Sequence, residues 1–171
     1  EPTDQLLSII SDFMKCLPEA KVIVVNDGSK SSPSKDILYQ ISRLNKVILL
    51  NHKVNEGKGA ALKTGFEYLL DQKIIFGNVV TADGDGQHAV VDIINTLNES
   101  VKTSKPILGV REFNFNIPFR SFIGNKITSL FFKLIIGRNL QDTQTGLRAF
   151  PIKDLPKLVK ISGQRYEYET R

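Results

Sequence analysis

The chain has 171 residues, of which 41% are hydrophobic and 24% are charged. This length and composition suit one domain with a sizeable core and exclude wholesale disorder, a collagen-like repeat and a polytopic membrane protein. The single cysteine, Cys16, excludes an internal disulfide framework, and the first residues lack the basic segment of a signal peptide. We therefore expect one domain over residues 1–171, located in the cytoplasm.

The basic residues are concentrated in the second part of the chain. The net charge is +5, but residues 1–102 carry 11 Lys and Arg against 13 Asp and Glu, whereas residues 103–171 carry 12 against 5. This asymmetry fits an anionic partner, such as a phosphate, an acidic membrane surface or a nucleic acid, and it fits a solvated basic face equally well. We expect no nucleic-acid partner, because neither an RNA-binding pattern of stacking aromatic residues nor a recognition helix accompanies the charge.

Amphipathic helices and short apolar strands alternate along the chain. The helices that the spacing of apolar residues predicts lie at 4–17, from 33 onward, at 58–72 and after 88. The strands predicted from runs of β-branched and aliphatic residues lie at 21–26, 46–51, 78–82 and 106–110. This order favours a parallel sheet with helices on both faces. Further along, the pattern predicts a helix at 121–136 and a short strand at 147–151.

Acidic residues follow two of the predicted strands. Asp27 comes directly after the strand at 21–26, and Asp83 and Asp85 follow a later strand, with Gln87 two residues further on. Ligands of a parallel sheet bind beyond the carboxyl ends of its strands, so these side chains are candidates for one site. Their oxygen atoms suit Mg²⁺ or Mn²⁺ shared with phosphates. The alternative is that DGDG is a tight glycine turn whose acidic residues cap a helix.

Other candidates have two interpretations each. The loop NEGKG, with Gly57 and Lys58, resembles part of a phosphate loop but lacks the full P-loop spacing, so its glycines can equally serve close packing. His88 is either a metal or phosphate ligand or a histidine with satisfied hydrogen bonds at a helix N-terminus, and we favour the second. We expect His52 on the surface.

Three arginines stand at predicted element boundaries. Arg111 ends a strand, Arg120 begins a helix, and Arg148 follows a Thr-Gly pair. Arginine binds phosphate oxygens bidentately, so these positions suit an anion site. Exposed salt bridges are the alternative.

Six sequence blocks, taken together in their order and spacing, resemble the inverting family 2 glycosyltransferases of the GT-A fold. The blocks are VIVVNDGS, NEGKGAALKTGF, TADGDGQH, GVREF, RSFIGNKITSLFFKLIIG and DTQTGLRAF. Within the family they are most similar to the polyprenyl-phosphate branch, of the dolichyl-phosphate mannose synthase type. The resemblance covers nearly all of residues 21–150 and implies an α/β domain with a Rossmann-like, mostly parallel central sheet flanked by helices.

The resemblance implies roles on the donor side. Asp27 is similar to the family's acid that contacts the nucleotide base, and Asn26 replaces a second Asp often found beside it. Asp83 and Asp85 are similar to the D-x-D pair that binds the metal on the donor diphosphate, with Gln87 as a further ligand. The implied cofactor is Mg²⁺ or Mn²⁺.

On the acceptor side, Arg111 and Arg120 are similar to basic residues that hold the acceptor phosphate, and Asp142 and Arg148 fall in the family's acceptor-side loop. The residues expected to be catalytic are Asp85, Arg111, Arg120 and Asp142. The residues expected to bind the donor are Asp27, Gly57, Lys58, Asp83 and Arg148.

The implied activity is transfer of a hexose from a UDP- or GDP-sugar to a polyprenyl phosphate, such as dolichyl or undecaprenyl phosphate, with inversion. A phosphate acceptor is already largely dianionic near neutrality and needs no strong base. The alternative acceptor, a saccharide hydroxyl as in cell-surface polysaccharide synthesis, would need Asp142 as the base. A non-catalytic sugar-nucleotide-binding module is the third possibility.

The resemblance also bears on the chain's ends and on membranes. The family's first strand would precede Glu1, and YEYET resembles a segment before membrane-binding helices, so we expect a catalytic domain truncated at both ends. The helix at 121–136 either rests at a membrane interface or packs into the core. We expect the whole protein to associate peripherally with the cytoplasmic face of a membrane.

Overall fold

The computed structural model describes residues 1–73, 77–109 and 146–163. Its helices are α1 (Asp4–Cys16), α2 (Ser32–Ser42), α3 (Lys58–Asp71), α4 (Val90–Thr103), the short 3₁₀ helix η1 (Ile152–Asp154) and α6 (Leu155–Val159). Its strands are β1 (Val22–Asn26), β2 (Val47–Asn51), β3 (Asn78–Thr81), β4 (Ile107–Leu108) and β5 (Arg148–Pro151). These bounds confirm the predicted elements up to residue 108 and the strand predicted at 147–151. The helix predicted at 121–136 lies outside the described residues.

The segment between β1 and α2 shows how local sequence sets the boundaries. The β-branched run of β1 ends at Asn26. Ser31 is the N-cap of α2, because its Oγ accepts a hydrogen bond from the backbone N–H of Ser34 at 3.3 Å, and Pro33 lies in the first turn. Residues 27–30 are therefore left as a loop beyond the carboxyl end of the strand.

The strands form two hydrogen-bonded groups. β1 and β2 are parallel, from Val22 opposite Val47 to Asn26 opposite Asn51. β5 lies between β3 and β4 and runs antiparallel to both. The predicted α/β class with a parallel sheet flanked by helices is confirmed, and the antiparallel insertion of β5 is an added feature. The sequence of a four-residue strand does not indicate whether its partners run parallel or antiparallel to it. The sequence pattern therefore did not predict the antiparallel pairing of β5.

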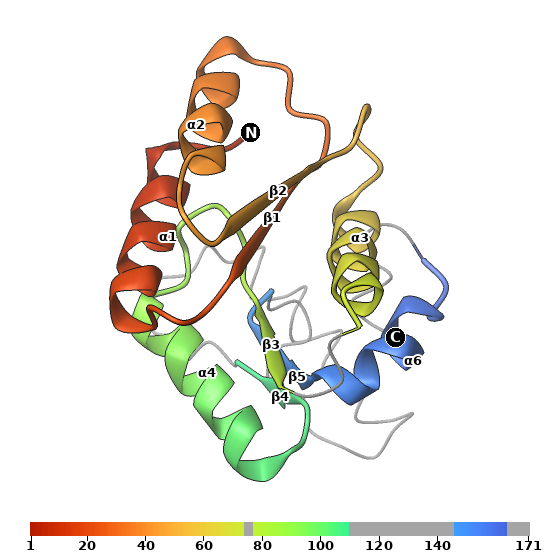
Figure 1. The fold of residues 1–171 in the computed structure, drawn as a ribbon. Helices are drawn as coiled ribbons and strands as arrows, with labels where there is room; N and C mark the ends of the chain where they lie inside the picture. Colours follow the sequence, from red (N-terminus) through yellow and green to blue (C-terminus); the bar gives the residue numbers. More distant parts are fainter. Residues whose placement is uncertain (74–76, 110–145, 164–171) are drawn as a thin grey trace, which may run out of the picture.

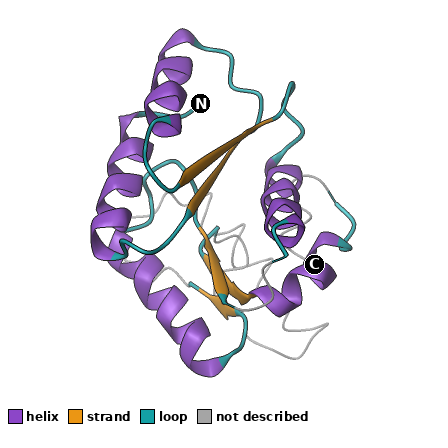
Figure 2. Ribbon diagram, viewed as in Figure 1, coloured by secondary structure: helices purple, strands orange, loops and turns teal. Residues whose placement is uncertain are grey.

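Helices cover both faces of the strands (Figures 1 and 2). Helices α1, α2 and α4 lie on one side, and α3 and α6 lie on the other. Val22 and Val24 of β1 pack with α1 and α2, whereas Val79 of β3 packs with α3 and α6 and Val80 packs with α1 and α4. This alternation is what a strand covered on both faces requires. No helix within the described ranges is both long enough and apolar enough to cross a bilayer.

Candidate active site

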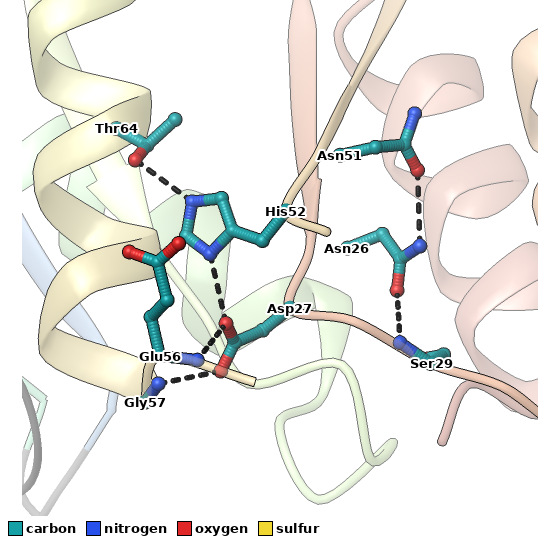
Figure 3. A network of polar contacts seen from close by, with 8 residues as sticks. All are labelled: Asn26, Asp27, Ser29, Asn51, His52, Glu56, Gly57 and Thr64. Carbon is teal, nitrogen blue, oxygen red and sulfur yellow. Dashed lines mark hydrogen bonds and ion pairs between the residues drawn. The ribbon is translucent and has the colours of Figure 1, made fainter. Parts of the chain in front are cut away.

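The carboxyl ends of the two parallel strands are joined by their last side chains. The Asn26 Nδ2 group donates a hydrogen bond to Oδ1 of Asn51 at 2.9 Å, and the backbone N–H of Ser29 donates to Oδ1 of Asn26 at 3.0 Å (Figure 3). Asn26 therefore links β1 to β2 and shapes the turn that carries Asp27.

Gly28 lets this turn pack against the loop that follows β2. Its φ is +74°, and a Cβ at this position would lie 2.5 Å from the carbonyl carbon of Val54 and 2.6 Å from the backbone nitrogen of Asn55. A larger residue would be both strained and in collision with backbone. The close contact between the two loops therefore requires glycine at position 28.

Asp27 is held by three hydrogen bonds (Figure 3). Oδ1 lies 2.8 Å from Nδ1 of His52 and accepts the backbone N–H of Glu56 at 2.9 Å, and Oδ2 accepts the backbone N–H of Gly57 at 2.8 Å. Burial of this carboxyl group favours its neutral form, but the hydrogen bonds outweigh burial and lower the pKa of Asp27 below its ordinary value. A carboxylate has about four acceptor positions, so Oδ2 retains room for a ligand donor.

His52 links Asp27 to helix α3. A carboxylate only accepts hydrogen bonds, so Nδ1 of His52 donates to Asp27, and Nε2 of the same ring is hydrogen-bonded to the hydroxyl of Thr64 at 2.9 Å. The His52 side chain is only 9% exposed, so the prediction of a surface residue is wrong. The position of His52 in the sequence could have indicated that it lies near Asp27. His52 directly follows β2, and the neighbouring strand β1 ends beside Asp27.

The loop before α3 connects the two predicted acidic positions. Gly57 contacts Asp27 through its backbone N–H, and Lys58, the first residue of α3, places its Nζ 2.7 Å from Oδ1 of Asp83. Two acidic residues from different strand ends therefore meet one short loop. The structure thus brings together Asp27, Gly57, Lys58 and Asp83, as a shared site requires.

The side chains around Asp83 stabilise the ionised form of its carboxyl group. Nε2 of His88 lies 3.7 Å from Oδ2, beyond hydrogen-bond length, and Lys58 contacts Oδ1. The His88 imidazole has the largest effect and Lys58 adds to it, so the pKa of Asp83 falls from 3.8 to about 2 although burial opposes the shift. Asp83 is consequently a full negative charge at neutral pH.

His88 is almost completely enclosed. Its side chain is 4% exposed, and its Nε2 has no hydrogen-bond partner in the part of the chain that the structure describes. The prediction of a histidine with satisfied hydrogen bonds is therefore wrong. A buried polar atom that faces Asp83 without a partner is a feature of sites that gain a ligand.

Gly146 forms one wall beside Asp83. A Cβ at position 146 would overlap both carboxylate oxygens of Asp83 and lie 2.5 Å from its Cγ. The hydroxyl of Thr81, the last residue of β3, donates to the carbonyl oxygen of Gly146 at 3.0 Å. Sequence reasoning used this glycine only as a landmark before Arg148. In the sequence, only the glycine of DTQTGLR itself indicates this contact. The residue that requires the glycine is Asp83, which lies 63 positions earlier in the chain.

Asp85 and Gln87 lie on the exposed side of the same loop. The backbone N–H of Gln87 donates to Oδ1 of Asp85 at 3.0 Å, and Gly86 has a φ of +83°. A tight turn is therefore present, but the N-cap of α4 is Ala89 and no side chain caps this helix. The reading in which these acidic residues serve as helix caps is wrong.

The donor set fits a divalent cation shared with a ligand. Within residues 1–73, 77–109 and 146–163, no three His, Cys, Asp or Glu side chains converge as a metal cluster. Mg²⁺ is commonly held by one or two carboxylates together with substrate phosphates and waters. The ionised Asp83, the exposed Asp85 and the unpartnered Nε2 of His88 suit that arrangement.

The acceptor half of the predicted site is placed only in part. Arg148 is the first residue of β5, pairs in register with Thr81 and is half-buried at the end of β3. Arg111, Arg120 and Asp142 lie outside the described residues, so their roles stay predictions.

Comparison with known proteins places this site in a family. The profile of Glycosyl transferase family 2 matches residues 4–146. The chain is 34% identical over 168 residues to the UDP-N-acetylglucosamine–dolichyl-phosphate N-acetylglucosaminyltransferase of Methanococcus voltae, with 85% of this chain and 64% of that protein covered. It is 30% identical over 141 residues to a dolichyl-phosphate beta-glucosyltransferase of Trichomonas vaginalis, with 76% and 41% covered.

A third relative is the undecaprenyl-phosphate mannosyltransferase of Micrococcus luteus, at 27% identity over 138 residues, with 78% of this chain and 56% of that protein covered. The chain thus spans less than two thirds of the length of these relatives. Their names match the polyprenyl-phosphate branch that the sequence blocks resemble. The predicted resemblance is confirmed, and the chain belongs to Glycosyl transferase family 2.

Proposed function

We propose that the protein transfers a hexose from a nucleoside-diphosphate sugar to a polyprenyl phosphate, with inversion at the anomeric carbon. The proposal depends above all on one observation, which is that Gly57 and Lys58 bring Asp27 and Asp83 to the same loop. The acceptor class is supported by relatives whose names specify dolichyl or undecaprenyl phosphate.

Each described residue has a distinct task toward the donor. Asp27 accepts an N–H of the nucleotide base at Oδ2, where acceptor capacity remains. Lys58 supplies a positive charge beside the diphosphate. Asp83 and Asp85 would hold Mg²⁺ or Mn²⁺, which when bound stabilises the negative charge of the departing diphosphate.

The acceptor phosphate acts as the nucleophile. With a second pKa of about 6 it is largely dianionic near neutrality, so its oxygen can attack without a general base. A bond forms from this oxygen to the anomeric carbon on the face opposite the diphosphate, while the bond from that carbon to the diphosphate breaks. The main obstacle is repulsion between two anions, and Arg111 and Arg120 are the proposed residues that offset it and align the acceptor.

The reaction is expected at a membrane surface, because the polyprenyl chain of the acceptor resides in the bilayer. We place the whole protein peripherally at the cytoplasmic face. The single cysteine is consistent with a reducing compartment.

The test incubates the intact protein with labelled UDP- and GDP-hexoses, with Mn²⁺ or EDTA. The acceptors are dolichyl phosphate, undecaprenyl phosphate or soluble saccharides. We expect label in the lipid fraction with Mn²⁺ and a lipid phosphate, and none with EDTA. Transfer to saccharides alone would overturn the lipid acceptor, transfer with EDTA would overturn the metal dependence, and nucleotide binding without transfer would identify a binding module. Absence of nucleotide binding would overturn the proposed enzyme altogether.

A further inference from the structure

The ion pair between Lys58 and Asp83 occupies a carboxylate oxygen that the proposed cation needs. Nζ of Lys58 lies 2.7 Å from Oδ1 of Asp83, and the two side chains are only 26% and 25% exposed. The other oxygen, Oδ2, faces the buried Nε2 of His88. The positive charge nearest to Asp83 among the described residues is therefore that of the protein's own lysine.

The backbone of Lys58 is fixed while its side chain can change partner. The preceding residue, Gly57, is anchored through its N–H to Asp27, and Lys58 begins α3. A lysine side chain has a flexible four-carbon stem and three rotatable donors. Its ammonium can therefore leave Asp83 for a neighbouring anion without any movement of the helix.

A divalent cation and the Lys58 ammonium compete for Asp83 when both lack another anion. Two like charges beside one half-buried carboxylate repel each other with little screening from solvent. A diphosphate changes this balance, because it binds the cation and offers the ammonium new oxygen partners.

We propose that Lys58 is the resident counter-ion of Asp83 and passes its contact to the donor diphosphate, so that the cation and the donor each strengthen binding of the other. This inference rests on the proposed function, since it assumes a diphosphate donor. Without donor, Lys58 keeps the cation weakly bound. With donor, Asp83 becomes available to the cation and Lys58 remains as a diphosphate ligand.

The test measures Mn²⁺ binding to the intact protein by electron paramagnetic resonance, first with Mn²⁺ alone and then with UDP or GDP present. In the wild type we expect the nucleotide to raise Mn²⁺ affinity about tenfold or more, within the usual range of coupling between sites. In Lys58→Met we expect Mn²⁺ alone to bind more tightly than in the wild type, while nucleotide binding weakens and the coupling shrinks. Lys58→Arg keeps the charge and should restore weak binding of Mn²⁺ alone.

Lys35→Met is the matched control, because it removes one positive charge from an exposed position of α2. It should leave both affinities unchanged, and thermal unfolding should show that all variants are folded. If Lys58→Met binds Mn²⁺ alone no more tightly than the wild type, while the wild type binds nucleotide with Mn²⁺, this inference fails and the proposed function stands. If the wild type binds neither UDP nor GDP in the presence of Mn²⁺, both fail.

Discussion

Gly146 and the carboxylate of Asp83 are in such close contact that a Cβ on the glycine would occupy the space of the carboxylate oxygens. The two residues come from β3's end and from the segment before β5, and Thr81 fixes their approach through the carbonyl oxygen of Gly146. The position of the ionised Asp83 carboxylate therefore depends on the absence of a side chain at position 146.

Gly146→Ala should displace Asp83 and weaken the site. Overpacking at a buried position costs about 1–3 kcal/mol, so we expect a lower free energy of unfolding in urea and a weaker Mn²⁺ signal in the presence of nucleotide. Gly65→Ala is the control, because a Cβ there would lie 3.7 Å from Cγ2 of Val25 in ordinary contact. In the helix it should be neutral or stabilising by up to about 1 kcal/mol. Equal effects of the two substitutions would contradict the specific role of Gly146.

His52→Ala should loosen Asp27. Loss of its two hydrogen bonds leaves Thr64 and one position of the Asp27 carboxylate without their partner, and each such loss costs about 1–3 kcal/mol. We expect lower stability in urea and a larger Kd for UDP or GDP. Thr64→Val removes only the hydrogen bond between His52 and Thr64 and leaves the one between His52 and Asp27. It should therefore lower stability more than nucleotide affinity. A variant at position 52 with wild-type nucleotide affinity would rule out its role in positioning Asp27.

The lowered pKa of Asp83 predicts an acid-dependent stability. A carboxyl group whose pKa is about 2 in the folded state and 3.8 when unfolded stabilises the fold above pH 3.8, and this contribution disappears as the pH falls toward 2. The shift corresponds to at most about 2.4 kcal/mol at neutral pH, and solvent screening of this partly exposed group reduces the expected contribution to about 1–2 kcal/mol. Urea unfolding from pH 6 to pH 2.5 should therefore show a steeper decline for the wild type than for Asp83→Asn. Parallel declines would show that this carboxyl group is not shifted.

Asp85→Asn should abolish transfer while sparing the fold. Asp85 is exposed, and its Oδ1 accepts the backbone N–H of Gln87, a hydrogen bond that an asparagine side-chain oxygen can also accept. The free energy of unfolding should therefore change by less than about 0.5 kcal/mol. If Asp85 is the metal ligand that we propose, its loss should lower kcat by at least about a hundredfold, because a bound cation would supply several kcal/mol of charge stabilisation. Wild-type turnover by this variant would refute the metal role of Asp85.

Local sequence predicted the strand ends and therefore the neighbourhood of Asp27 and Asp83. Both acids follow short, partly buried strands rich in apolar residues, and the residues that follow such strands are expected at the carboxyl-end edge of a sheet. The glycine loop before α3 was also identified, since glycine and the start of a helical period mark it. These features depend on neighbours within a few residues.

The contacts of His52, His88 and Gly146 could not be predicted in the same way. Each depends on which segments meet in space: His52 on the approach of α3 to β1, His88 on the position of Asp83, and Gly146 on the insertion of β5. No periodicity encodes these meetings, so a histidine beside a strand end was taken for a surface residue. A single-sequence pattern predicts which residues occupy an edge but not which of them touch.

The placement of β5 between β3 and β4 also sets the order in which the protein can mature. Neither β3 nor β4 has another strand partner within the described ranges, and the hydrogen bond from Thr81 to the carbonyl oxygen of Arg148 spans 67 positions. During synthesis the ribosome must therefore release this late segment before the earlier strands can join. Closing so long a loop is slow compared with forming the adjacent β1–β2 pair. A nascent chain that stops short of Gly146 already contains every residue that hydrogen-bonds to Asp27, but it lacks the glycine that lies against the Asp83 carboxylate.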